Sequence, residues 1–229
     1  MCGRYSLTSP PEAMRRLFGF STRPNLPARY NIAPTQDVPV VRLGDREGGR
    51  ELAMMRWGLV PSWAGEIGRV APLINARIES VLSKPAFRQA VRARRCLVPA
   101  DGFYEWAGPA GGKQPYYVTL GARPLFAFAG IWERRRDAAG AALDSMAILT
   151  APSNRILAPI HDRMPVIVTP REYAMWLDCD GVAAADAVAS IRPPEPEDFE
   201  VRAVSDHVNA VAHDDRRCIE GMEPQARLL

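Results

Sequence analysis

The sequence predicts an α+β fold with a largely antiparallel, barrel-like β core flanked by short helices. Two observations carry this prediction: many short apolar runs are bounded by Gly, Pro, Asn and Asp, and few runs have helical spacing. A chain of 229 residues is long enough to bury a sizeable core. Because the sequence contains neither an internal repeat nor a clear linker, we expect one domain over residues 1–229.

The first expected helix covers residues 11–20. Met14, Leu17 and Phe18 recur at helical spacing, Ser9 is placed to cap the amino end, and Gly19 is placed to end the helix. Residues 30–35 should be extended, because a residue before proline avoids the α region.

The remaining elements follow from apolar runs and turn residues. Strands are expected at residues 38–43, 52–57, 95–100, 103–106, 116–120, 124–132, 145–150, 166–168 and 199–204. Turns should occupy 45–49, 101–102, 108–112 and 134–142, and further helices should pass through 87–91, 172–177 and 182–191.

The composition is that of an ordinary soluble protein, with 47% hydrophobic and 24% charged residues. No apolar run approaches the roughly 20 residues that span a bilayer, and the first residues lack the apolar stretch of a secretory signal. We therefore expect a cytoplasmic protein with no membrane partner. Its four cysteines should be free thiols in that compartment.

The cysteine spacing argues against a metal centre. Cys2, Cys96, Cys179 and Cys218 form no C-x-x-C pair. The group His207, His213 and Cys218 is loosely spaced and lacks a fourth ligand, so the sequence favours a polar surface stretch there. We expect neither a metal nor a cofactor, and nothing in the sequence indicates an oligomer, which favours a monomer.

The basic residues are concentrated in one block. Residues 69–95 hold seven Lys or Arg and one acid, a local charge of +6 in a chain whose formal net charge is +3. Such a block favours a polyanionic partner, most simply a nucleic-acid backbone. A solvated helix face is the alternative, and charge alone leaves both open.

Cys2 becomes the amino terminus if Met1 is removed. It then carries an α-amine and a thiol on neighbouring carbons, a pair suited to an aldehyde: the amine forms a Schiff base and the thiol closes a thiazolidine ring. An α-amine of pKa about 7.8 is roughly a tenth free base at pH 7, against less than a thousandth for a lysine. Position alone leaves open that Cys2 is incidental.

Three further segments carry chemistry. Glu105 lies in an aromatic run, where an apolar setting raises a carboxyl pKa toward the range useful for proton transfer; an exposed or salt-bridged Glu is the alternative. His161 is next to Asp162, which can fix its tautomer, although a structural histidine fits equally. Asn75 and Arg77 offer an amide and a phosphate-pairing guanidinium from one segment.

The two tryptophans of residues 57–63 invite different interpretations. Trp57 fits the core, whereas Trp63, beside a serine and ahead of a glycine-containing loop, can stack against a flat ligand such as a base.

Several ordered motifs resemble one family, the SOS-response-associated peptidases, which are abasic-site processing proteins. The motifs are residues 1–4 (MCGR), 30–34 (YNIAP), 57–63 (WGLVPSW), 75–79 (NARIE), 96–106 (CLVPADGFYEW) and 160–165 (IHDRMP), followed by a C-terminal signature at 204–209 and 218–220. The resemblance runs nearly end to end, and six motifs in order are far more specific than any one of them.

The resemblance implies a covalent crosslink to abasic sites in single-stranded DNA, which shields the lesion from strand cleavage. It assigns catalytic roles to Cys2, Asn75, Glu105 and His161. It assigns DNA contacts to Arg4, Asn31, Pro34, Trp63, Arg77 and Arg163. Two alternatives stay open: a thiol peptidase, or autopeptidase, that uses Cys2, and a noncovalent reader of single-stranded or modified DNA.

Overall fold

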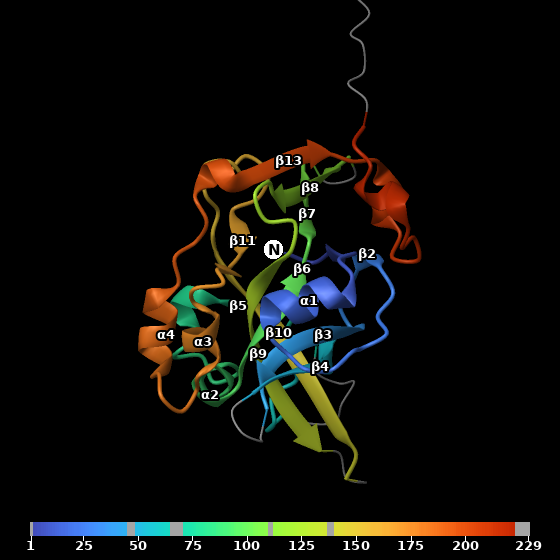
Figure 1. Ribbon diagram of the computed structural model, residues 1–229. Coiled ribbons are helices and arrows are strands. Elements are labelled where there is room, and N and C mark those ends of the chain that lie inside the picture. Colours follow the sequence, from blue (N-terminus) through green and yellow to red (C-terminus); the bar gives the residue numbers. More distant parts are fainter. Residues whose placement is uncertain (1, 45–48, 65–70, 110–111, 137–139, 223–229) are drawn as a thin grey trace, which may run out of the picture.

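The computed structural model describes residues 2–44, 49–64, 71–109, 112–136 and 140–222 (Figure 1). Its centre is a closed barrel formed by β3 (Asp37–Leu43), β4 (Arg50–Trp57), β6 (Arg95–Ala100), β9 (Phe126–Arg136) and β10 (Ala142–Pro152). The pairing order β10–β4–β3–β6–β9 closes because β9 also pairs with β10. Most pairs are antiparallel, while β10 runs parallel to β4 and to β5 (Asn75–Arg77). The predicted α+β class and barrel-like antiparallel core are confirmed.

A second sheet crosses one end of the barrel, in the order β13–β8–β7–β1–β2. Its strands are β1 (Tyr5–Leu7), β2 (Arg29–Ile32), β7 (Gly102–Ala107), β8 (Gln114–Leu120) and β13 (Phe199–Ala203). β7 follows β6 after a single residue, Asp101, so the chain passes directly from barrel to sheet. A side chain at Gly102 would meet the Tyr117 ring at 2.4 Å, which is why glycine stands at this passage.

The register of β7 distributes its side chains between two apolar clusters, since successive residues point to opposite faces. Phe103 joins the main core inside the barrel, whereas Tyr104 joins a smaller cluster with Tyr117, Val208 and Cys218. Trp57 is fully buried in the main core, as predicted. The smaller cluster attaches the C-terminal segment to the second sheet.

The helices are short and lie outside the barrel (Figure 1). They are α1 (Pro11–Phe18), α2 (Arg88–Ala93), α3 (Tyr173–Leu177) and α4 (Ala184–Ser190), with 3-10 helices η1 (Ile78–Ser80), η2 (Pro196–Asp198), η3 (Asp206–Asn209) and η4 (Arg216–Ile219). Within the described residues, no helix combines the length and apolar character needed to cross a membrane.

Three local predictions differ from the structure. Ser9 does not cap α1: its N–H donates to Asp101, Pro10 takes the capping position, and the helix ends as expected before Gly19 at φ 75°. The turn expected at 134–142 is shorter, because β9 continues to Arg136 and Arg134 pairs across the ribbon with Asp144. Short strands β11 (Arg163–Pro165) and β12 (Ile167–Val168) replace one run at 166–168. Parts of the turns expected at 45–49 and 108–112 lie outside the described residues.

Candidate functional site

Cys2 lies immediately before β1, and its side chain is fully buried. Its carbonyl accepts a hydrogen bond of 2.9 Å from Asn75 Nδ2, and its thiol lies 3.9 Å from the carbonyl of Arg4. Burial, followed by the negative charge of Glu105, raises the pKa of the Cys2 thiol above its ordinary value. The sulfur is therefore held as a neutral thiol and requires a base for reaction.

Asn75 is the first residue of β5, where it pairs with Ile148 of β10. This backbone pairing fixes the amide beside Cys2. Its Oδ1 is buried and has no hydrogen-bond partner among the described residues. A buried acceptor of this kind is costly unless it is satisfied, so the position favours an N–H donor brought close to Cys2.

Glu105 stands in β7 opposite Tyr116 and is 4% exposed. Burial raises the pKa of its carboxyl to about 7. A group that titrates near neutral pH both accepts and returns a proton readily. Glu105, Trp106, Lys113 and His161 line an open pocket of about 350 Å³.

His161 lies on the turn between β10 and β11. The backbone N–H of Arg163 donates to its Nδ1 at 2.9 Å, and a carboxylate oxygen of Asp162 lies at the same distance from that nitrogen. The N–H of Arg163 favours an unprotonated Nδ1, whereas the carboxylate of Asp162 favours a proton on the same nitrogen, so the two contacts favour opposite tautomers. Burial lowers the pKa of His161, which favours the neutral ring.

These contacts bring the four predicted catalytic residues into one region. Asn75 touches Cys2, the charge of Glu105 acts on the Cys2 thiol, and His161 lines the same pocket as Glu105. The four come from the amino terminus, β5, β7 and the β10–β11 turn. Their catalytic roles stay predictions.

The two arginines predicted to bind DNA differ in their surroundings. Arg77 ends β5 and is exposed. Arg163 forms a two-pronged ion pair with Glu79 at 2.6 and 2.9 Å and also donates to the carbonyl of Thr150. The Arg163 guanidinium lowers the pKa of Glu79, so Glu79 is ionised and offsets the arginine charge. Arg77 is the freer cation for a phosphate.

Arg4 and Asn31 hold the C-terminal segment. Arg4 donates to Asn31 Oδ1 and to the carbonyl of Val208, both at 2.8 Å. Asn31 is fully buried and donates to the carbonyls of Val208, Ala210 and His213. The structure therefore gives both side chains partners inside the protein, and their predicted DNA contacts stay predictions.

Trp63 and Pro34 are accessible. Trp63 is 68% exposed, and Pro34 is half-buried in the turn before Thr35. The basic block of residues 69–95 is only partly available to a polyanionic partner, and Arg69 lies outside the described residues. Arg95 is buried and donates to the carbonyls of Trp176, Val91 and Val182, while Arg94 pairs with Glu133.

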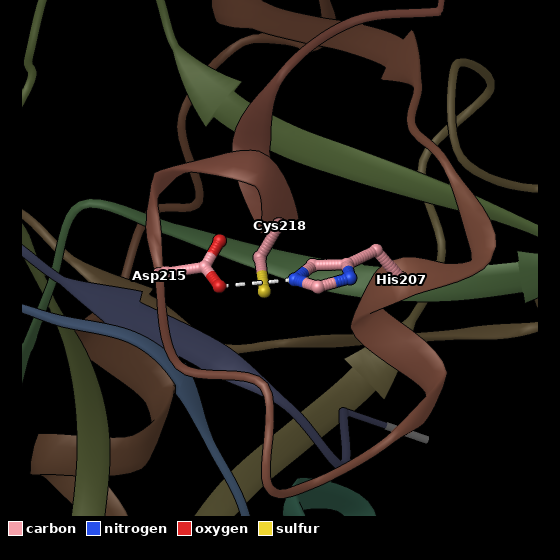
Figure 2. Close-up of side chains that lie close together, drawn as sticks. All are labelled: His207, Asp215 and Cys218. Atoms are coloured by element: carbon pink, nitrogen blue, oxygen red, sulfur yellow. Dashed lines mark hydrogen bonds and ion pairs between the residues drawn. The ribbon is translucent and has the colours of Figure 1, made fainter.

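Sequence reasoning missed two features. The Trp106 Nε1 donates to Asn209 Oδ1 at 2.8 Å, which fixes the indole at the rim of the pocket. The interpretation of His207, His213 and Cys218 as a polar surface stretch was wrong for Cys218, which is fully buried, whereas both histidines are partly exposed. Figure 2 shows the side chains of His207, Asp215 and Cys218 close together, with an interaction drawn between Asp215 and His207. Asp215 Oδ2 lies 3.1 Å from His207 Nε2. This group offers the ligand types of a metal ion.

The sequence matches the family model described as SOS response associated peptidase (SRAP) over residues 1–211. It is 34% identical to "Abasic site processing protein YoqW" of Bacillus subtilis, over 96% of this chain and 99% of that protein. It is 30% identical to "Abasic site processing protein HMCES" of Gallus gallus, over 97% and 78% respectively. A crystal structure of a Bacteroides thetaiotaomicron protein shares the fold with a TM-score of 0.85 at 24% identity, covering 97% of this chain and 100% of that one.

Proposed function

Because the chain belongs to the SOS response associated peptidase family, we propose that it processes abasic sites in single-stranded DNA by a covalent crosslink through Cys2. Relatives that align over almost the whole chain are named abasic site processing proteins. One observation supports the proposed chemistry. Cys2 lies close enough to Glu105 for the carboxylate charge to raise the pKa of the Cys2 thiol, and the pKa of Glu105 itself is about 7.

The reaction requires removal of Met1, which leaves the α-amine of Cys2. That amine adds to the C1′ aldehyde of the open abasic sugar, and loss of water gives an imine. The Cys2 thiol then adds across the C=N bond: the S–C1′ bond forms and the thiol proton ends on nitrogen. Because amine and thiol belong to one residue, ring closure is intramolecular and gains a large effective molarity. The thiazolidine removes the imine that would otherwise promote β-elimination and strand cleavage.

The surrounding residues divide the proton transfers. Glu105 takes a proton from the ammonium and returns one to the departing hydroxyl, which its pKa near 7 allows. His161 takes a proton from solvent and, as the imidazolium, passes it to the ring oxygen as the sugar opens, which returns the ring to the neutral form that burial favours. The unpartnered Oδ1 of Asn75 accepts an N–H of the Cys2 amine or of the thiazolidine.

The DNA contacts follow the exposed groups. Arg77 pairs with a flanking phosphate, and Arg163 offers a second contact beside Glu79. Trp63 stacks on a base, with Pro34 alongside. A single strand leaves its bases open to such stacking. We propose that the protein acts as a monomer.

The test is denaturing gel electrophoresis of the untagged protein with a single-stranded oligonucleotide that contains one abasic site. The wild type should give a heat-stable adduct. Cys2→Ala should give none, and Cys2→Ser should give only an adduct that requires borohydride reduction, because a hydroxyl closes no thiazolidine. Cys179→Ala, which changes a thiol outside the site, is the matched control. An undiminished heat-stable adduct with Cys2→Ala would refute the proposal.

The same samples separate the alternatives. If the protein were a noncovalent reader, the Cys2→Ala variant would bind abasic DNA with the affinity of the wild type. No variant would then leave an adduct after denaturation. A general thiol peptidase would cleave unrelated peptides. We expect no such cleavage, and we expect mass spectrometry of the crosslinked protein to find Cys2 as the first residue. An adduct formed by protein that still retains Met1 would contradict the amine chemistry.

A further inference from the structure

Three potential metal ligands converge on the C-terminal segment, away from Cys2. They are His207 of η3, Asp215 at the start of η4, and Cys218 within η4 (Figure 2). Their ligand atoms all lie within 4.8 Å of one another. From this convergence we propose that His207, Asp215 and Cys218 bind one divalent ion of the zinc class, with water in the fourth position.

The donor set suits such an ion. Imidazole nitrogen, carboxylate oxygen and thiolate sulfur are the zinc ligands of proteins, at about 2.0–2.3 Å from the metal. Two ligands of one tetrahedral ion therefore lie about 3.3–3.8 Å apart. His207 Nε2 and Asp215 Oδ2 are already 3.1 Å apart. Closing the site requires movements of only about 1 Å in side chains.

Each ligand is oriented by a separate contact. The His207 ring stacks on His213 at a centroid separation of 3.9 Å with 10° between the planes. Asp215 Oδ1 accepts from the N–H of Arg217 at 2.9 Å, which caps η4. Cys218 is fixed by complete burial. Outer contacts of this kind hold the first ligands of metal sites in place.

Charge is balanced when the ion binds. The proton of the Cys218 thiol passes to solvent as the sulfur–metal bond forms, so thiolate and carboxylate together offset the dication. Arg217 pairs with the same carboxylate through Nη2 at 2.8 Å, but its side chain is mostly exposed and can swing away from Oδ2. Its backbone contact to Oδ1 remains.

The ion would fasten the segment that supports the amino terminus. Val208 and His213, beside or between the ligands, provide carbonyls for Arg4 and Asn31. Asp214, next to Asp215, accepts from the backbone of Tyr30 and Asn31 and from Arg29. Metal binding would therefore link η3 to η4 in the segment that hydrogen-bonds to Arg4, next to β1, and to Asn31 of β2.

The experiment uses untagged full-length protein, stripped of metal by a chelator and titrated with Co²⁺. A cobalt–sulfur bond gives a near-ultraviolet charge-transfer band. We expect this band at one Co²⁺ per chain, reversed by Zn²⁺. Cys218→Ser should abolish it, and His207→Gln and Asp215→Asn should weaken binding by about tenfold or more.

Two thiol variants are the controls. The band should persist in Cys179→Ser and in Cys2→Ala, so its loss in either one, or its persistence in Cys218→Ser, overturns the proposal. If the wild type shows no charge-transfer band at about tenfold molar excess of Co²⁺ over sites, the proposal is also overturned. If buried Cys218→Ser fails to fold, the half-exposed Asp215→Asn decides: Zn²⁺ should raise the melting temperature of the wild type clearly more than that of this variant, which binds the ion about tenfold more weakly. An equal rise in both refutes the site. The outcome is independent of crosslink formation.

Discussion

At the residue scale, Glu105 carries a conflict between stability and reactivity. Its carboxyl is buried and its pKa is raised from an ordinary 4.5 to about 7. The folded state therefore binds a proton more tightly than the unfolded state, so stability falls as pH rises from about 4.5 to about 7 and then levels off. The loss is on the order of 3 kcal/mol.

Glu105→Gln should remove this dependence. Chemical denaturation at pH 4.5 and pH 8 should show a smaller decline in the free energy of unfolding than in the wild type, because glutamine stays neutral throughout. The rate of adduct formation should fall by about 10²-fold, the typical contribution of one acid–base group. A variant whose unfolding free energy declines with pH as steeply as that of the wild type would contradict the assignment of Glu105 as the buried titrating group.

Asn75 gives a second residue-scale prediction. Asn75→Ala removes the hydrogen bond to the Cys2 carbonyl and the unpartnered Oδ1 together. The net loss of stability should be small, about 1 kcal/mol, because an unsatisfied acceptor disappears with the bond. The single-turnover rate of adduct formation should fall by more than this small loss of stability explains, which is checked by measuring the rate and the melting temperature of the same variant. A rate that falls only as far as the folded fraction falls would indicate a purely structural role for Asn75.

Some residues of the candidate site can be predicted from their neighbours along the chain, and others cannot. Cys2, Glu105 and His161 are recognisable because their neighbours along the chain already suggest the chemistry. Asp215 and Asn209 are not, because their partners His207 and Trp106 are brought to them only by folding. Likewise, nothing local indicates that Arg95 turns inward to the carbonyls of α3 and its neighbours.

At the element scale, strand existence was predictable and strand pairing was not. Runs of apolar and β-branched residues mark β3, β6 and β9 well. The parallel pairing of β5 with β10 joins residues more than seventy positions apart, as Asn75 and Ile148 show. That pairing is what places Asn75 beside Cys2, so the site depends on long-range order that periodicity does not report.

The end of β5 also tests the nucleic-acid surface. Arg77→Ala should reduce the slope of log K against log salt for single-stranded DNA by about 0.7, the share of one phosphate contact. Arg136→Ala is the matched control. Arg136 is the last residue of β9, and the β9–β10 ribbon projects from the end of the barrel that lies away from the second sheet (Figure 1). Titrations by fluorescence anisotropy at several salt concentrations give both slopes. Equal slopes for Arg77→Ala and the wild type would remove Arg77 from the interface.

At the scale of the whole molecule, the C-terminal segment acts as a brace for the amino terminus. Residues from η3 to η4 pack on the second sheet through Val208 and Cys218, and they bond to β1 and β2 through Arg4 and Asn31. Cys2, the proposed reactive residue, lies immediately before β1. Its position therefore depends on what holds β1 and β2.

Asp214 is the point at which this brace should fail. Its carboxylate accepts from Arg29 and from the backbone of Tyr30 and Asn31, so Asp214→Ala leaves those donors without their partner. The protein should lose about 3 kcal/mol of stability, since hydrogen bonds to charged groups are the stronger ones. Hydrogen exchange should quicken in β2 and η3 while the barrel strands β6 and β9 stay protected. Asp144→Ala, which removes the partner of Arg134, should cost much less, because among the described residues it leaves no backbone N–H without an acceptor. Uniform loss of protection across barrel and sheet would show instead that the two parts unfold as one unit, without a separate brace.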